Sequence, residues 1–110
     1  MEVPKAKHIV VLVTANGEEE AKKIAKRLLE ERKAVCINII NGVSSLFRWQ
    51  GKHEEERESL LVIKSSASFL QQIVEVVKQS HSYDVPEIIA LPVIGGNEDY
   101  LEWIDSGLER

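Results

Sequence analysis

Residues 35–64 read VCINIINGVSSLFRWQGKHEEERESLLVIK, a pattern typical of one long β-hairpin. β-Branched and aromatic residues fill Val35–Trp49, Gln50-Gly51-Lys52 supplies the turn, and the chain returns along His53–Lys64. A straight strand from Val35 to Trp49 would reach roughly 50 Å, whereas a compact domain of this size is roughly 35 Å across. We therefore expect the hairpin to kink at Asn41-Gly42, to protrude from the domain, or to do both.

Two further strands are predicted by continuous apolar runs. Ile9–Val13 carries no polar residue, which indicates a strand buried on both faces. Ile88–Val93 is the second such run, and Pro92 places it at the edge of a sheet because proline cannot donate a ladder hydrogen bond.

Three amphipathic helices are predicted between and after these strands. Apolar residues recur at three- and four-residue spacing over Ala21–Leu29 and again over Phe69–Val77, and a short last helix carries Tyr100–Leu108. The residues expected to cap these helices are Asn16, Ser68 and Asn97.

The order of elements is therefore β-α-β-β-α-β with a final helix. This order predicts an α+β fold, the ferredoxin-like βαββαβ sandwich, with a long hairpin between its second and third strands and a C-terminal helix. At 110 residues the chain is expected to form one domain, residues 1–110, with one hydrophobic core.

Self-association is predicted from two features of this fold. A protruding two-stranded ribbon is marginal in water and exposes strand edges, and its tip carries Phe47 and Trp49. The central strands, Ile9–Val13 and Leu60–Ile63, are apolar on both sides, so the sheet face opposite the helices is apolar too. The short last helix can shield only part of that face, and such a patch is unusual in a monomer.

Composition excludes several classes of function. With 44% hydrophobic and 29% charged residues the chain is an ordinary globular protein. Its net charge of −4 argues against a nucleic-acid partner, which would need a basic stripe. No apolar run approaches the length of a membrane span. The single cysteine excludes an intramolecular disulfide and suits a reducing compartment, so we expect a cytoplasmic protein.

Candidate chemistry is limited to a few side chains. Cys36, among Val35, Ile37 and Ile39, is expected to be a buried structural thiol, because a reactive thiol needs a positive and partly exposed setting. Carboxylates between Lys52 and Glu58 could hold a hard cation. Strand alternation, however, spreads them over two faces among compensating charges, which favours a solvated surface.

The loop His81–Glu87 follows a predicted helix and precedes a strand, a position where ligand-binding groups often lie. His81 could bind a metal ion through an imidazole nitrogen, with an oxygen from Asp84 or Glu87. The alternative is that His81 caps the carbonyl groups of the preceding helix while Tyr83 packs against its surroundings.

The chain resembles the CutA family of divalent-cation tolerance proteins from about His8 to Leu108. The matching stretches are Val13-Thr14-Ala15, Ala34-Val35-Cys36-Ile37-Asn38, Ser45-Leu46-Phe47-Arg48-Trp49-Gln50-Gly51, Leu61-Val62-Ile63-Lys64-Ser65, His81-Ser82-Tyr83-Asp84-Val85-Pro86-Glu87-Ile88 and Tyr100-Leu101-Glu102-Trp103-Ile104. The resemblance implies a ferredoxin-like homotrimer whose long hairpins pack on neighbouring subunits. It also implies a link to copper and other divalent metals, and an architecture like that of PII-type signal proteins.

The resemblance further implies a cleft between subunits. Its lining, carried over position by position, would be Cys36, Asn38, Trp49, Lys64, His81, Tyr83 and Glu87. Some members of the family are credited with copper ligands from a cysteine near the end of the first strand and from two adjacent histidines. Those positions hold Val13 and Ser80-His81 here, so His81 is the metal ligand that the resemblance implies. Phe47 replaces the more usual tyrosine at the hairpin tip.

Three functional interpretations follow. The first is a non-catalytic trimer that binds copper or another divalent cation weakly and contributes to metal tolerance. The second is a PII-like sensor or scaffold that binds a small anionic ligand between subunits, with Lys64 and His81 facing the anion. The third is an enzyme with Cys36 as nucleophile and His81 as base. It ranks last because no triad-like set is visible, so we expect no catalysis.

Overall fold

The computed structural model describes residues 6–109, which form a four-stranded antiparallel sheet and three α-helices. The elements are β1 (His8–Ala15), α1 (Glu18–Glu30), β2 (Cys36–Trp49), β3 (Lys52–Ser66), the 3-10 turn η1 (Ala67–Phe69), α2 (Leu70–Ser80), β4 (Ile88–Val93) and α3 (Glu98–Gly107). Their order confirms the predicted β-α-β-β-α-β pattern with a final helix. The predicted domain of residues 1–110 also takes in residues 1–5 and 110, which lie outside the described residues.

The strands lie in the order β2-β3-β1-β4. β1 and β3, which carry the apolar runs Ile9–Val13 and Leu60–Ile63, are therefore central, and β4 with its Pro92 lies at an edge, as predicted. β1 pairs antiparallel with β3 on one side and β4 on the other, with Val11 opposite both Ile63 and Ala90.

The prediction that the run Ile9–Val13 is buried on both faces is wrong for the single chain. Val11 and Val13 have no exposed surface, whereas Val10 and Leu12, which point to the opposite face, are half-buried.

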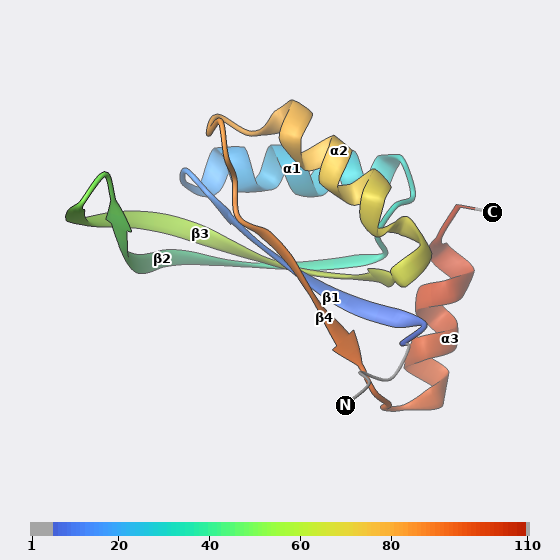
Figure 1. Cartoon of the computed structure of the whole chain (residues 1–110). Coiled ribbons are helices and arrows are strands. Elements are labelled where there is room, and N and C mark those ends of the chain that lie inside the picture. Colours follow the sequence, from blue (N-terminus) through green and yellow to red (C-terminus); the bar gives the residue numbers. More distant parts are fainter. Residues whose placement is uncertain (1–5, 110) are drawn as a thin grey trace.

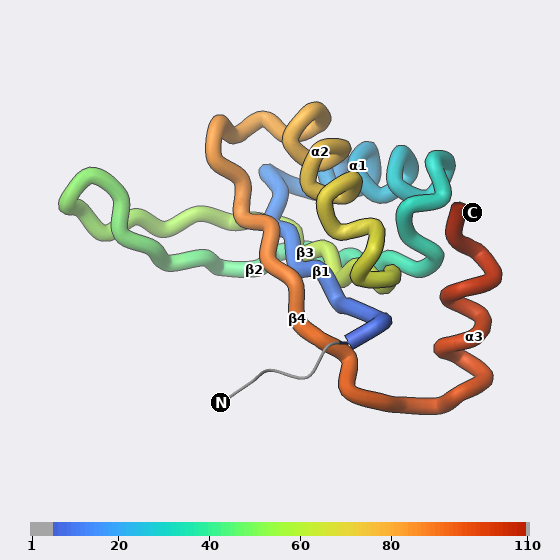
Figure 2. Tube along the Cα trace, turned by 45° about the vertical axis from the view of Figure 1, so that its right-hand side comes forward, coloured from blue at the N-terminus to red at the C-terminus, as the bar shows by residue number. Residues whose placement is uncertain are grey.

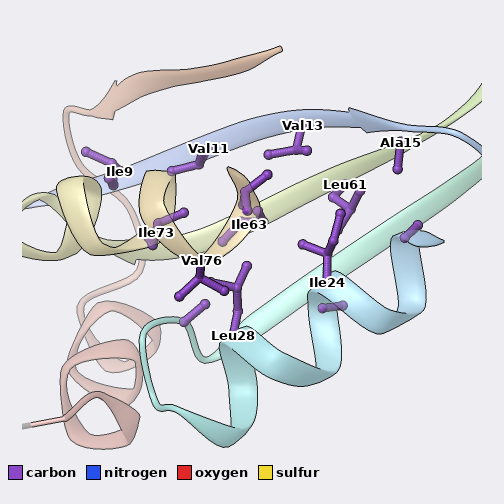
Figure 3. Close-up of a cluster of buried hydrophobic side chains, with 14 residues drawn as sticks. Ile9, Val11, Val13, Ala15, Ile24, Leu28, Leu61, Ile63, Ile73 and Val76 are labelled. Atoms are coloured by element: carbon purple, nitrogen blue, oxygen red, sulfur yellow. The ribbon is translucent and has the colours of Figure 1, made fainter. Parts of the chain in front are cut away.

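α1 and α2 cover one face of the sheet and form the core with it (Figure 1). Their apolar stripes meet the side chains that alternate onto that face from β1 and β3 (Figure 3). The large apolar side chains with no exposed surface are Val11, Val13, Ile24, Leu28, Leu61, Ile63, Ile73 and Val77.

The β2–β3 hairpin both kinks and protrudes, as predicted (Figures 1 and 2). The register between the strands shifts between Ile40 and Val43, and Gly42 adopts a positive φ of 71° there. A Cβ on Gly42 would also meet the Arg57 guanidinium at 3.1 Å, so glycine suits this bulge on both counts. Ser59 donates a hydrogen bond of 2.8 Å to the Asn41 side chain and fixes the kink from the opposite strand.

The predicted helix caps are confirmed only for α3, where the Asn97 side chain accepts a hydrogen bond from the Asp99 backbone. The prediction for Asn16 is wrong, because Gly17 takes the N-cap position of α1 with φ 96°. The Asn16 backbone instead donates to the Glu20 carboxylate. The prediction for Ser68 is also wrong, because Ser68 lies inside η1 and α2 begins only at Leu70.

The opposite face of the sheet, which we call the open face, is covered only near α3. α3 packs at the end of the sheet far from the hairpin tip (Figure 1) and buries Ile104 and Leu108. Asp105 fixes it there by accepting a hydrogen bond of 2.9 Å from His8. Elsewhere the open face presents about half of each of Ile40, Ile89 and Leu91 to solvent. The predicted exposed apolar face is thus confirmed.

Candidate functional site

A hollow of ≈ 990 Å³ lies between the hairpin and the loop that connects α2 to β4. The end of β1 forms its floor, β2 and β3 form one wall, and the loop forms the other. The residues that line it are Thr14, Asn16, Ser45, Leu46, Phe47, Trp49, Glu54, Glu56, Glu58, Ser82, Tyr83, Asp84, Val85 and Glu87. Five residues of the loop therefore line a hollow, at the position where the sequence analysis expects ligand-binding groups.

The hollow is strongly acidic. Five of its lining residues are carboxylates, and none of the described residues that line it is Lys, Arg or His. Alternation along β3 brings Glu54, Glu56 and Glu58 to the same wall. Rings of Phe47, Trp49 and Tyr83 share the lining. Such a surface attracts cations through its charge and, at the ring faces, through cation–π contacts.

The predicted solvated stretch of β3 is confirmed for residues 52–57, which are exposed, but Glu58 is buried. The Tyr83 hydroxyl donates a hydrogen bond of 2.9 Å to Glu58 and ties the loop to the hairpin stem. Burial and the neighbouring Glu58 carboxylate together raise the pKa of Tyr83 to about 12. The phenol is therefore a donor throughout the neutral range.

His81 lies behind this wall with its side chain fully buried. Its Nε2 bonds to the Thr14 carbonyl at 2.7 Å, and its Nδ1 accepts the Tyr83 backbone N–H at 3.0 Å. Because a carbonyl only accepts and a backbone N–H only donates, these two partners fit the tautomer that carries its proton on Nε2. A metal ion at His81, as the resemblance implies, would have to displace one of these partners. The predicted cap on the carbonyl groups of α2 is wrong, because the carbonyl that His81 contacts belongs to β1.

Glu20 is the residue of this region that sequence reasoning missed. Its carboxylate accepts the backbone N–H of Asn16 at 2.7 Å and that of Ser82 at 2.8 Å, which joins the start of α1 to the loop. Partial burial raises the pKa of Glu20, but hydrogen bonds from Ser82 and Asn16 outweigh it, so the pKa lies below its ordinary value. The partner at residue 82 is far away in sequence and leaves no local signal.

The structure divides the seven predicted cleft residues into two groups. Trp49, Tyr83 and Glu87 line the hollow, and His81 supports it from behind. Cys36 and Lys64 meet elsewhere, as direct partners of β2 and β3, with Lys64 Nζ at 3.8 Å from Cys36 Sγ. Asn38 follows Cys36 on the same face and is exposed.

The postulated catalytic pair is not formed, since Cys36 neighbours Lys64 while His81 bonds Thr14 and Tyr83. Cys36 is half-buried at the first position of β2, less enclosed than the sequence predicts. Among the described residues, no three His, Cys, Asp or Glu side chains are grouped as metal ligands.

Tyr83→Phe is expected to lower the free energy of unfolding by about 1–3 kcal/mol, because buried Glu58 loses its donor. The bond contributes its full stability at pH values below ~10, the ordinary tyrosine pKa. This contribution is lost as the pH rises through about 12, the folded-state pKa of Tyr83. Denaturant unfolding of wild type and variant at neutral pH measures the difference. The matched control is Tyr100→Phe, whose hydroxyl has no carboxylate partner in residues 6–109. Equal effects of both changes would contradict the role given to Glu58.

Comparison with known proteins gives one consistent result. Residues 9–107 match the family described as CutA1 divalent ion tolerance protein. The chain is 48% identical over 95 residues to the divalent-cation tolerance protein CutA of Thermus thermophilus, covering 86% of this chain and 92% of that protein. It is 46% identical over 96 residues to the chloroplastic CutA protein of Arabidopsis thaliana, covering 87% of this chain but 53% of the plant protein. It therefore spans about half the length of that relative.

Solved structures agree with the sequence comparison. The crystal structure of CutA1 from Oryza sativa superposes with a TM-score of 0.93 at 43% identity, covering 96% of both chains. An agreement of this extent includes the sheet, the hairpin and α3.

Proposed function

The chain belongs to the CutA1 family of divalent ion tolerance proteins, and from that premise we propose that it is a non-catalytic homotrimer that binds copper and other divalent cations weakly and contributes to tolerance of them. The observation that carries the proposal is the family match over residues 9–107. The acidic hollow supports it, because carboxylate oxygens are the ligands that hard divalent cations prefer.

Assembly into a homotrimer is supported by the surfaces that one chain leaves uncovered. The hairpin tip presents Leu46, Phe47 and Trp49 to solvent, and the open face presents Ile40 and Leu91. These are two separate apolar regions on a small domain, and burying both requires a second surface. In a closed ring of identical chains, every chain can bury both regions against its neighbours through the same set of contacts.

Weak binding is supported by the geometry of the carboxylates. Glu54, Glu56 and Glu87 line one hollow but are not grouped as a set of ligands within the described part of one chain. Exposed carboxylates attract a cation by charge and hold it loosely, since water screens the interaction. A neighbouring chain that covers the hollow would exclude this water and so strengthen the attraction between the carboxylates and a cation.

The test is calorimetry of Cu(II) and Zn(II) binding to the purified assembly. Glu56→Gln is expected to weaken binding about fivefold, since removing one nearby surface charge costs roughly 1 kcal/mol. Glu75→Gln removes an equal charge at an exposed position of α2, outside the hollow, and should leave binding unchanged. His81→Ala tests the other candidate ligand. If the wild type binds neither ion, the proposal fails; if only His81→Ala weakens binding, the hollow is the wrong site.

A PII-like sensor or scaffold that binds a small anion is the second candidate function. Lys64 favours it, because this half-buried lysine has the Cys36 thiol as its hydrogen-bond partner and forms no ion pair within residues 6–109. A lysine in this state attracts anions rather than metal ions.

A cytoplasmic location is also proposed, on the support of the single cysteine. No helix within residues 6–109 has the length and apolarity that crossing a membrane requires. The Arabidopsis relative is named as chloroplastic. Its name describes that protein, and the present chain matches only about half of it.

A further inference from the structure

Glu58 is a buried carboxylate without a counter-charge. The residue is only 7% exposed, and its Oε2 accepts a hydrogen bond from the neutral phenol of Tyr83. No Lys, Arg or His within residues 6–109 forms an ion pair with it. A carboxylate that is withdrawn from water and paired with a neutral donor is costly to keep charged. A positive charge beside Glu58 would remove this cost.

The second oxygen of this carboxylate, Oε1, opens into the acidic hollow. Glu58 lines the hollow, and its side-chain hydrogen bond within residues 6–109 is made by Oε2. Among the same residues, every fully buried side-chain oxygen or nitrogen has a hydrogen-bond partner. Oε1 therefore keeps contact with solvent, and the solvent beside it lies in the hollow. An unpaired oxygen of a buried charge thus faces a cavity, which points to a cationic ligand.

Glu58 is also the inner end of a row of carboxylates. Glu54, Glu56 and Glu58 alternate onto one face of β3, and all three line the hollow. Alternate residues of a strand lie ~6.6 Å apart, a distance that an extended chain of about four methylene groups also spans. Lys52 comes next on this face, at the hairpin turn, and ends the row. The spacing favours a linear molecule with several amino groups over a single ion.

The other basic residues of the hairpin lie on its opposite face. His53 and Arg57 alternate with the carboxylate row along β3, and Arg48 on β2 is the direct partner of His53. None of these three residues lines the hollow. The hairpin therefore carries the bases that could neutralise the row on the side away from it, and the row remains available to an external cation.

The hollow has the volume of a small-molecule site. Its ≈ 990 Å³ falls at the upper end of the range of ~300–1,000 Å³ that is typical of such pockets. Tyr83 lines it beside Glu58, so an aromatic ring adjoins the inner carboxylate. An alkylammonium presents a charge together with apolar methylene groups, and so suits a lining that mixes carboxylates with rings.

We propose that the acidic hollow binds a linear polyamine, whose ammonium groups pair with Glu58, Glu56 and Glu54 in turn. The innermost ammonium pairs with Oε1 of Glu58, and the chain then follows the row towards the hairpin turn. This ligand is an organic cation and not a metal ion, so the site goes beyond the proposed function and does not rest on it. It makes no use of Phe47 or Trp49 at the hairpin tip, which self-association would cover.

The test is calorimetry of diaminobutane and spermidine binding to the purified full-length protein, in buffer that contains EDTA so that no metal ion contributes. Wild type is expected to bind both amines saturably, and to bind spermidine more tightly because a further ammonium reaches the row. Butylamine has the same carbon chain as diaminobutane but one charge fewer, and should bind about tenfold more weakly.

Two variants locate the site. Glu58→Gln keeps an acceptor for Tyr83 but removes the charge, and should weaken spermidine binding about tenfold. Glu56→Gln changes an exposed position, where folding is not at risk, and should weaken binding about fivefold. The matched control is Glu55→Gln, because Glu55 is also exposed but lies on the other face of β3, outside the hollow. It should bind spermidine as the wild type does.

Four results would overturn the polyamine site: no saturable binding by wild type, unchanged binding by Glu56→Gln, an equal loss in Glu55→Gln, or Mg(II) binding as tight as that of diaminobutane. The last result would mean that the hollow collects counter-ions by charge alone. Binding of Cu(II) and Zn(II) without binding of either amine would reject the polyamine site and leave the proposed function standing. Binding of the amines without binding of the metals would do the reverse.

Discussion

Replacing Ile63 with alanine is expected to lower the free energy of unfolding by about 2–5 kcal/mol, the largest effect anticipated for a single change in this chain. Ile63 has no exposed surface and lies on the central strand β3, opposite Val11 on one side and Ile37 on the other. Truncation removes buried methyl groups and leaves a cavity that the two central strands and the helices above cannot close. Urea unfolding at a fixed protein concentration measures the loss.

Ile94→Ala is the matched control for this prediction. It removes the same atoms from a residue that is 90% exposed just after β4, and should change stability by less than about 0.5 kcal/mol. The concentration must be held constant because self-association adds to apparent stability. A loss below ~1 kcal/mol for Ile63→Ala would mean that the core under α1 and α2 is looser than its burial indicates.

The success of the fold prediction has a local cause. The short continuous run Ile9–Val13 favoured a strand, and the hairpin was too long to lie straight within the domain, so a kink at Asn41-Gly42, a protrusion, or both were expected. The first residues of the helices were harder to predict, because several neighbouring residues can take the N-cap position and their backbone geometries decide which one does. Gly17, with its positive φ, takes the N-cap position of α1 instead of Asn16. Ser68 lies within η1, before the start of α2.

The candidate site was only partly predictable, because its contacts join residues far apart in the chain. His81 bonds a carbonyl 67 positions away, and Tyr83 bonds a carboxylate 25 positions away. Neither partner can be identified from spacing, so the sequence indicated the loop but not what holds it. The last helix was predicted without a position on the sheet, since nothing in the sequence links Asp105 to His8, 97 positions away.

Trp49→Ala is expected to weaken assembly far more than it weakens the fold of one chain. Trp49 is 56% exposed at the end of β2, so truncation costs few contacts within its own chain. If the hairpin tip rests on a neighbouring subunit, as we propose, the same change removes a buried interface aromatic, which often costs at least ~2 kcal/mol. Sedimentation over a range of protein concentrations should show the variant dissociating about thirtyfold more readily than the wild type.

Leu29→Ala separates an interface effect from a general loss of stability. Leu29 is 41% exposed, comparable to Trp49, but it lies on α1 in the helix layer rather than on the hairpin. It should leave the association state unchanged while causing a similar small loss within the chain. A Trp49→Ala variant that sediments and melts like the wild type would show that Trp49 anchors no partner. The exposed tip would then need another explanation, and the open face would carry the case for assembly alone.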